Sequence, residues 1–433
     1  MNRSLHGPPF SACAGFLLLL LLAIPRAEAA GWPQWRGVNR DGLAIGEVAP
    51  QGLPLEMRPI WKRPCGGGFS SPVVAGGQLI YTEEEDGQEV ARALRAADGA
   101  ELWRKPFAES FGDEWGSGPR STPVIDDDRV YIQSCKGEFQ CRLVKDGSLV
   151  WRTHFEKDFG VEFVGTKVNE GAAIRRGHNG SALIDGERIL VPVGSTNGAT
   201  IACFDKRSGK LLWKSLSDET AYSSPVLATL GGVRQAVVFT ADALVGLDPV
   251  SGKSLWRVPI KTNAKRHAIS PVIVGDDRVV VASHSYGMIC VRVEKDSGGL
   301  KATTAWWNRE MKVNLSTPTR VGGALYGFGA GQDYVCVDGA DGHVRWSQPG
   351  FGKGVKTDYA ATLAIEDRLL ILNDAGQLFL AAADPSRCQI LGRSQVCGKT
   401  WSHPALSDGR LFVRDGRMLQ CFVLSPEALP TAK

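Results

Sequence analysis

Short runs of apolar, often β-branched residues alternate along this chain with turns rich in glycine and acidic residues. Such a pattern predicts short β-strands joined by hairpins. One of these runs follows Ser71-Pro72, and similar runs begin at Thr122, Ser181, Ser224, Ser270, Thr317, Ala361 and Ser402. Pro72 and Pro404, in the first and last copies, lie 332 residues apart, so the mean period over seven steps is near 47 residues. A period of this length is typical of four-stranded propeller blades.

A second repeated element confirms this register. A small residue is followed six positions later by a turn glycine and ten positions later by tryptophan. Five copies share this spacing and end at Trp103, Trp151, Trp213, Trp256 and Trp346, while a sixth, from Cys290 to Trp306, is lengthened by an insertion. Each unit therefore reads as strand, hairpin, strand, hairpin. The sequence predicts an all-β fold, an eight-bladed β-propeller of four-stranded blades.

The two ends of the repeat predict how the ring closes. Residues 59–62 resemble a Trp-bearing fourth strand around Trp61 with no preceding strands, whereas the last unit, from Ser402 to Leu424, has three strands. We expect the N-terminal strand to complete the last blade, since such closure removes the open sheet edges. The predicted divisions are 1–29, 30–58 as an N-terminal extension, 59–425 as the propeller, and 426–433 as a tail.

Residues 1–29 have the pattern of a cleaved secretory signal. Arg3 precedes an apolar run over residues 12–24, and Ala27-Glu28-Ala29 supplies small residues at the cleavage spacing. The run is shorter than the roughly 20 residues needed to cross a bilayer. Cys13 lies before the leucine-rich run and cannot be the lipid acceptor of a lipoprotein signal. We expect an exported protein, periplasmic or extracellular, without an anchor.

Composition and charge narrow the function classes further. Hydrophobic residues make up 43% and charged residues 22%, which is ordinary globular composition, and 51 glycines fit a turn-rich β protein. The formal net charge of +4 is too slight to indicate a nucleic-acid partner. The sequence contains no hydrolase nucleophile elbow and no pair of histidines at helical metal spacing. We assign no catalytic residues and no metal ligands.

The tryptophan element resembles the docking motif of pyrroloquinoline quinone (PQQ) repeat propellers. The best copies are residues 203–213 and 246–256, and the opening Trp32-Pro33-Gln34-Trp35-Arg36-Gly37 is similar to the start of secreted bacterial members. The resemblance covers essentially the whole chain after residue 29. It implies eight blades, with a tryptophan of each blade stacked on a neighbouring blade. The implied docking residues are Trp61, Trp103, Trp151, Trp213, Trp256, Trp306 and Trp346.

This family includes quinoprotein dehydrogenases and non-catalytic relatives such as the BamB-type scaffold of the outer-membrane assembly machine. Quinoprotein alcohol dehydrogenases typically have an adjacent Cys-Cys disulfide and sometimes a Cys-x-x-Cys-His haem motif, and this sequence contains neither. It also lacks the lipobox of a BamB-type lipoprotein. Family site residues therefore do not transfer directly to this chain.

The cysteines follow the repeat. Five of them, Cys141, Cys203, Cys290, Cys336 and Cys421, occupy the same small-residue position in different blades, where we expect buried free thiols. Two pairs leave a disulfide open: Cys135 with Cys141 across a hairpin, and Cys388 with Cys397.

Two connections between blades are unusually long, 20 residues from Trp103 to Pro123 and 31 residues from Trp151 to Ala182. In a propeller these connections share one face around the central channel, so we expect them to form an asymmetric wall there. The same set of loops contains many cations, which favour an anionic ligand such as PQQ. The candidate ligand-binding residues are Arg120, Arg175, Arg176, His178, Asn179, Lys265, Arg266, His267, Lys312, Asn314, Lys356, Asp358, Lys399 and Trp401.

Two functions remain open at this point. The first is an exported, non-catalytic binding or assembly scaffold that meets a protein partner or a small anionic ligand at the long loops. The second is a PQQ-dependent dehydrogenase with a divergent site, in which Ca²⁺ would polarise the quinone and Asp358 or Glu219 would act as base. We expect a monomer in either case.

Overall fold

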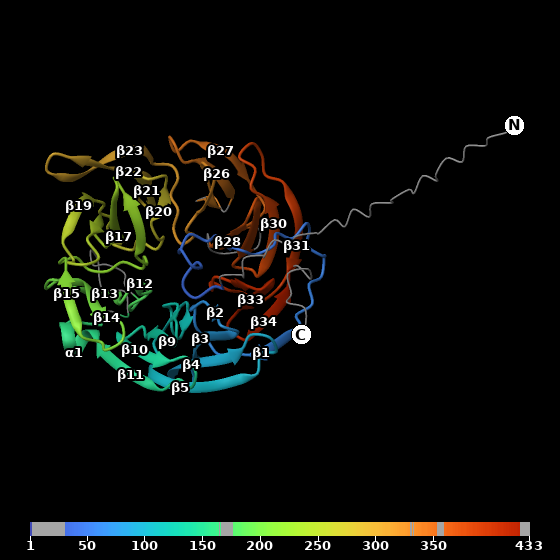
Figure 1. The fold of residues 1–433 in the computed structure, drawn as a ribbon, viewed down its shortest axis with the longest axis horizontal. Coiled ribbons are helices and arrows are strands. Elements are labelled where there is room, and N and C mark those ends of the chain that lie inside the picture. Colours follow the sequence, from blue (N-terminus) through green and yellow to red (C-terminus); the bar gives the residue numbers. More distant parts are fainter. Residues whose placement is uncertain are drawn as a thin grey trace.

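The computed structural model describes Met1 and residues 31–163, 165, 176–329, 331, 333–352 and 359–424. The predicted signal peptide and the tail at 426–433 lie outside the described residues. Eight four-stranded antiparallel sheets are arranged as blades around a central channel (Figure 1). The predicted eight-bladed, all-β fold is confirmed.

The first four blades, in chain order, use these strands. Blade 1 is β2 (Val73–Ala75), β3 (Gln78–Glu85), β4 (Gln88–Arg95) and β5 (Glu101–Glu109); blade 2 is β8 (Val124–Asp126), β9 (Arg129–Gln133), β10 (Glu138–Leu143) and β11 (Leu149–His154); blade 3 is β12 (Leu183–Asp185), β13 (Arg188–Ser195), β14 (Ala199–Asp205) and β15 (Leu211–Ser215); blade 4 is β16 (Val226–Leu230), β17 (Val233–Phe239), β18 (Ala243–Leu247) and β19 (Ser254–Pro259).

The other four blades complete the ring. Blade 5 is β20 (Val272–Val274), β21 (Arg278–Ser283), β22 (Gly287–Asp296) and β23 (Gly299–Asn308); blade 6 is β24 (Thr319–Val321), β25 (Ala324–Phe328), β26 (Tyr334–Asp338) and β27 (Val344–Gln348); blade 7 is β28 (Ala360–Ile365), β29 (Arg368–Asn373), β30 (Gln377–Ala382) and β31 (Ile390–Gln395); blade 8 is β32 (Ala405–Ser407), β33 (Arg410–Arg414), β34 (Met418–Val423) and β1 (Trp61–Pro64). A hairpin of β6 (Gly112–Asp113) and β7 (Gly116–Ser117) and the short helix α1 (Phe155–Phe159) lie in the two long connections.

The N-terminal strand closes the ring as predicted. β1 pairs antiparallel with β34, with Trp61 opposite Cys421, and the N–H of Ile60 donates to the carbonyl of Cys421 at 2.8 Å. The last blade therefore combines residues from both ends of the propeller. Hydrogen bonds along this pair satisfy the edge that β34 would otherwise expose.

Burial explains the apolar runs. A middle strand lies between two neighbouring blades, so both of its faces are covered and alternation disappears. All five residues of β25 are buried, whereas the outermost strand β27 is exposed or half-buried throughout. The core clusters cross blade boundaries: one contains Tyr131 of blade 2 and Ile189 of blade 3.

Most of the predicted docking tryptophans meet the next blade. The indole Nε1 of Trp103 donates to the carbonyl of Val144 at 2.6 Å, and a Cβ on Gly147 would lie 2.8 Å from the Trp103 ring. Equivalent bonds to the next blade are made by Trp61, Trp151, Trp213, Trp306 and Trp346. The glycine of the motif is therefore required because the indole leaves no room for a side chain.

Trp256 departs from the predicted docking. Its Nε1 donates to Oε1 of Gln235 in its own blade. The reason is the insertion in blade 5, where β22 and β23 are ten residues each and the short glycine turn is absent. Without that turn, Trp256 has no equivalent platform on the next blade.

The Ser/Thr-Pro element links the innermost strands around the channel. The N–H of Thr122 donates to Oγ of Ser181 at 2.9 Å, and the N–H of Ser181 donates to Oγ of Ser224 at 3.0 Å. The N–H of Ser270 makes the same bond to Oγ1 of Thr317 at 3.0 Å. A hydroxyl is needed at this position because it accepts the backbone N–H of the preceding blade.

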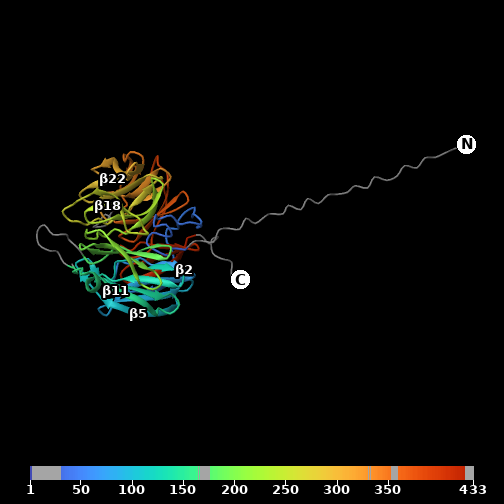
Figure 2. The same ribbon diagram turned by 60° about the vertical axis from the view of Figure 1, so that its left-hand side comes forward.

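The N-terminal segment 31–48 enters the channel from one face. The carboxylate of Glu47 accepts the N–H groups of Asp408 and Gly409, in the turn between β32 and β33. The fully buried guanidinium of Arg36 donates to the carbonyls of Thr317 at 2.8 Å and Pro318 at 3.0 Å. Figure 1 shows this blue segment reaching toward the middle of the ring, and Figure 2 shows it on one side of the ring.

A second arginine and two tryptophans of segment 31–48 also contact the channel wall. The guanidinium of Arg40 donates to the carbonyl of Pro225, just before β16 of blade 4, at 2.6 Å. The ring of His403 lies between Trp32, at a centroid distance of 6.2 Å, and Trp35, at 5.3 Å. Residues 31–48 therefore close one end of the channel. The other end stays open to solvent.

All nine cysteines after residue 29 are free. Neither of the two disulfides that the sequence left open is formed. Cys141 is fully buried opposite Trp151 in its strand pair, while Sγ of Cys135 faces the carbonyl of Gly118. The five cysteines of the repeat position are buried, as predicted for small apolar side chains.

Candidate functional site at the channel mouth

One face of the ring gathers the connections between blades. Because successive strands are antiparallel, every loop from the outermost strand of one blade to the innermost strand of the next lies on the same face. We call this the long-loop face. It is opposite to the face from which segment 31–48 enters. At its centre is a cavity of about 420 Å³ lined by Trp35, Phe69, Trp115, Arg120, Thr122, Arg176, Asn179, Ser181, Tyr222, Ser224, Arg266, Ala268, Ser270, Asn314, Leu315, Tyr359 and Trp401.

The cavity contains six of the predicted ligand-binding residues. They come from five different connections and are Arg120, Arg176, Asn179, Arg266, Asn314 and Trp401. Segments far apart in sequence thus converge as the propeller geometry requires.

Aromatic rings form much of the wall. The Trp35 indole donates to Oγ of Ser270 at 3.1 Å, which fixes the ring at the inner end of the cavity. The Trp401 ring lies between those of Phe69 and Trp115, with both centroid distances 5.3 Å. Trp115 is 45% exposed although its ring packs on this stack. An exposed indole at a cavity mouth is available to a ligand.

Two of the three cavity arginines bind the β6–β7 hairpin. Arg120 lies 2.8 Å from the Asp113 carboxylate, and Arg176 lies 3.0 Å from the same group. Arg176 also forms an ion pair with Glu114, and this hydrogen bond is the main cause of its raised pKa. Asp113 therefore bridges the buried Arg176 and the partly buried Arg120 and fixes the hairpin, with Trp115 at its tip, over the cavity.

Arg266 has a different environment. Its Nη2 donates to Oδ1 of Asn314 at 3.1 Å, and its Nε is buried without a hydrogen-bond partner. Within the described part of the chain, no carboxylate lies within ion-pair distance of Arg266. Arg266 is thus the cavity arginine whose charge is left for a ligand.

Further polar atoms at the cavity are buried and unsatisfied. Besides Nε of Arg120 and of Arg176, they are Oδ1 of Asn179, the hydroxyl of Tyr359 and Nε1 of Trp401. Burial raises the pKa of Tyr359, so this group stays a neutral donor and acceptor. Buried polar groups nearly always have partners, and such a cluster is typical of a site that binds water or ligand.

The predicted histidines do not line the cavity. His178 packs edge-on against Phe155 at 4.9 Å, and His267 stacks on Phe239 at 4.2 Å. Burial lowers the pKa of His267 to about 4. The structure therefore places both rings in the packing behind the cavity wall.

The predicted lysines are distributed around the mouth. Nζ of Lys265 lies 3.8 Å from the Glu219 carboxylate, outside the cavity lining, and Lys312 is exposed. Lys399 lies over the Trp401 ring at 5.4 Å and borders an adjoining groove. Arg175, Lys356 and Asp358 lie outside the described residues.

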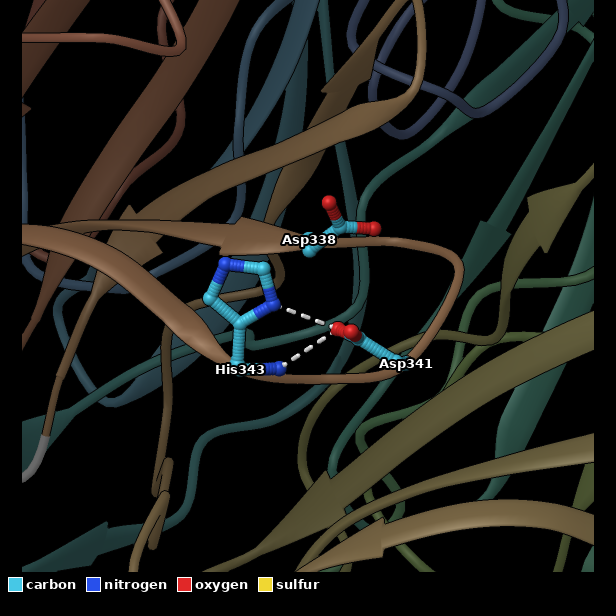
Figure 3. Close-up of side chains that lie close together, drawn as sticks. All are labelled: Asp338, Asp341 and His343. Carbon is cyan, nitrogen blue, oxygen red and sulfur yellow. Dashed lines mark hydrogen bonds and ion pairs between the residues drawn. The ribbon is translucent and has the colours of Figure 1, made fainter.

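The described residues include one group with the composition of a metal site. Asp338, Asp341 and His343 have ligand-type atoms within 4.8 Å of one another (Figure 3). Nδ1 of His343 already bonds Asp341 at 2.6 Å, and Asp338 accepts from Arg345 and from the N–H of Ala340. This is the β26–β27 turn of the repeat, equivalent to the turns after Asp205 and Asp248, and its hydrogen bonds stabilise the turn.

Sequence reasoning missed the aromatic lining. Trp35, Phe69, Trp115, Tyr222 and Tyr359 all border the cavity. The predicted ligand-binding residues do not include them, although Trp115 lies in a predicted long loop and Phe69 lies two residues before Ser71-Pro72. Aromatic residues at these loop positions were the available signal.

A family model described as outer membrane protein assembly factor BamB matches residues 86–348, more than half of the chain. The chain belongs to this family. Outer membrane protein assembly factor BamB of Yersinia pestis is 23% identical over 328 residues, which are 72% of this chain and 71% of that protein. The predicted membership of the PQQ-like propeller family is thereby confirmed.

Solved structures of the BamB family and of quinoproteins share the fold. BamB from Moraxella catarrhalis superposes with a TM-score of 0.53 at 14% identity, covering 87% of this chain and 96% of that one. Quinohemoprotein alcohol dehydrogenase ADHIIG from Pseudomonas putida also has a TM-score of 0.53, at 10% identity, covering 94% and 82%. In the described residues, no helix is both long and apolar enough to span a membrane.

Proposed function

We propose that this protein is an exported, non-catalytic binding scaffold whose binding surface is the long-loop face, with the channel-mouth cavity at its centre. The observation that carries the proposal is the chemistry of the cavity lining. Among the 17 described lining residues there are aromatic rings, hydroxyls, amides and arginines, but no Asp, Glu, His, Cys or Lys. Such a lining can hold and orient a ligand, and its Ser, Thr and Tyr hydroxyls have no His, Lys or carboxylate beside them among the described lining residues to act as general base.

Membership of the BamB family supports the proposed scaffold function. The family description and the Yersinia pestis relative both refer to outer-membrane protein assembly. Export is supported by the predicted signal at residues 1–29. The exposed Trp115 and the convergence of five connections supply a contact surface around the cavity.

The alternative, a PQQ-dependent dehydrogenase, is only partly compatible with the residues present. PQQ is a planar tricarboxylate, and Arg266 together with the aromatic wall fits a planar anion. Ca²⁺ requires several oxygen ligands, usually with carboxylates among them, and no described lining residue is a carboxylate. Glu219 faces Lys265 outside the lining, and Asp358 lies outside the described residues. The described lining therefore does not fit the Ca²⁺ part of the cofactor pair.

A cofactor titration tests this choice. Purified protein is titrated with PQQ, with and without Ca²⁺, while absorbance and the thermal midpoint are followed, because a ligand of the folded state raises the midpoint. The scaffold proposal expects no Ca²⁺-dependent shift. A saturable shift that requires Ca²⁺ would favour the dehydrogenase.

Site-specific photocrosslinking tests the binding surface in cells. A photoreactive residue replaces Trp115 on the long-loop face, and a matched one replaces Val250, which is 58% exposed in a turn on the opposite face. We expect discrete protein adducts from position 115 and none from position 250. Absence of adducts from position 115 would contradict the proposed binding face.

A further inference from the structure

The channel-mouth cavity continues into a second hollow on the long-loop face. A groove of about 270 Å³ has Gly67, Gly68, Gly116, Gly416 and Lys399 in its lining. Phe69, Trp115 and Trp401 border both the groove and the cavity. The aromatic stack of these three residues is therefore a shared ridge between two adjacent hollows, and together they form one elongated site.

Each hollow has a cation without a carboxylate partner. In the described part of the chain, neither Arg266 in the cavity nor Lys399 in the groove lies within ion-pair distance of an acidic side chain. The Asp415 carboxylate also borders the groove, but it accepts the N–H groups of residues 398, 417 and 418. One cation without a carboxylate partner therefore borders each hollow, and the Asp415 carboxylate, held by these three N–H groups, keeps its negative charge in the groove.

The ridge itself is better suited to contact an aromatic side chain than to stack on a sugar ring. Phe69 and Trp115 each pack on Trp401 at 5.3 Å, and the guanidinium of Arg120 lies 5.2 Å from the Phe69 ring centroid. Most ring faces are thus already covered, and the ridge offers mainly edges and the exposed part of Trp115. Ring edges pack well against another aromatic side chain.

The unsatisfied polar atoms complement peptide groups. Oδ1 of Asn179 can accept a backbone N–H, and Nε1 of Trp401 can donate to a backbone carbonyl. Of the four glycines in the groove lining, Gly416 has open space where a Cβ would lie, so another main chain can approach closely there.

We infer that the cavity and groove together bind an extended acidic segment of a polypeptide, with carboxylates at Arg266 and Lys399 and an aromatic side chain at the Phe69–Trp401–Trp115 ridge. This inference rests on the proposed scaffold function, since it names the chemistry of the partner that the long-loop face takes. An acidic oligosaccharide is the competing occupant, and the experiment below separates the two.

Isothermal titration calorimetry measures the interaction directly. The probe is an acetylated, amidated heptapeptide of glycines with glutamates at its second and sixth positions and phenylalanine at its centre. Matched peptides replace both glutamates with glutamine, or phenylalanine with alanine. We expect saturable binding of the acidic aromatic peptide, with affinity reduced about tenfold for the glutamine peptide because charge-assisted contacts are lost.

Charge-removing variants locate the site. We expect Arg266→Gln to weaken binding of the acidic peptide about tenfold, and the more exposed Lys399→Gln to weaken it about threefold. Lys253→Gln is the matched control, because Lys253 is exposed in the β18–β19 turn of the opposite face, and it should leave the affinity unchanged. Thermal midpoints of all three variants check that each is folded.

Three outcomes would overturn the inference. The first is no measurable peptide binding by the folded protein, and the second is binding that Arg266→Gln and Lys399→Gln leave unchanged. The third is binding of an oligomer of glucuronic acid, with the same sensitivity to Arg266→Gln, in place of the peptide. Crosslinks from position 115 would persist in each case if the scaffold proposal is right, so failure of the peptide inference is distinguishable from failure of the proposed function.

Discussion

The backbone N–H of His403 donates a hydrogen bond of 2.9 Å to the hydroxyl of Ser71, and this bond joins the last blade to the first. The two residues are 332 positions apart, yet they occupy equivalent places in the repeat. The Ser71 N–H in turn donates to Oγ1 of Thr122 at 3.3 Å. Ser71 therefore links its own blade to both neighbours at the inner end of the channel.

Replacing Ser71 tests this closure. Ser71→Ala removes the acceptor and leaves the buried N–H of His403 without a partner, so we expect the free energy of unfolding to fall by about 1–3 kcal/mol. Urea denaturation gives the value. Ser297→Ala, in an exposed turn, is the control and should change it by less than about 0.5 kcal/mol. Equal effects of the two substitutions would contradict the proposed role of Ser71.

A glycine pair tests tryptophan docking. Gly209 has a φ of 73°, and a Cβ there would lie 2.6 Å from the Trp151 ring. Gly186 has a φ of 57° and open space around it. Gly186→Ala should lower the free energy of unfolding by about 1 kcal/mol from backbone strain, and Gly209→Ala by at least about 1–3 kcal/mol more from overpacking. Similar losses of unfolding free energy for both variants would show that the Trp151 indole moves aside at little cost, which would contradict tight docking.

Burial of His267 predicts acid sensitivity. Its pKa is lowered from 6.5 to about 4 by burial, so below pH 6.5 the unfolded chain binds a proton that the folded chain does not. Stability contributed by the neutral ring is therefore present above pH 6.5 and is lost between pH 6.5 and 4, by about 3 kcal/mol in all.

His267→Phe should flatten this part of the stability profile. The phenyl ring can keep the stack on Phe239 and does not titrate. Denaturant unfolding at pH 6.5, 5.5 and 4.5 for both proteins checks the slope. An unchanged slope in the variant would assign the acid sensitivity to other groups, such as His403, whose pKa burial lowers to about 3.

The β6–β7 hairpin depends on one carboxylate. Asp113→Asn leaves Arg120 and Arg176 without their shared counter-ion, so we expect the hairpin to open locally. Hydrogen exchange of residues 110–118 should then accelerate by about tenfold or more, which corresponds to about 1.4 kcal/mol of lost local stability. Asp98→Asn, which removes an exposed pair with Arg95, should leave exchange at 110–118 unchanged. Protection that survives Asp113→Asn would mean that packing of Trp115 alone fixes the hairpin.

The repeat in the sequence was enough to predict the architecture. Each blade buries both faces against its neighbours, so most blades share the same apolar runs, turn glycine and inner hydroxyl, and blade 5 lacks the short glycine turn. The sequence therefore repeats with a regular period. This period was enough to predict the number of blades, the closure by residues near Trp61 and the buried cysteine positions.

The site, in contrast, depends on contacts between loops that are far apart in the sequence. Arg176 and Arg266 look alike in the sequence, but Arg176 neutralises Asp113 and Glu114 while Arg266 faces the cavity beside Asn314. Loop residues have no period, and their partners come from other blades, so no local pattern reports them. The aromatic ridge likewise joins Phe69, Trp115 and Trp401, which are neighbours only because the ring closes.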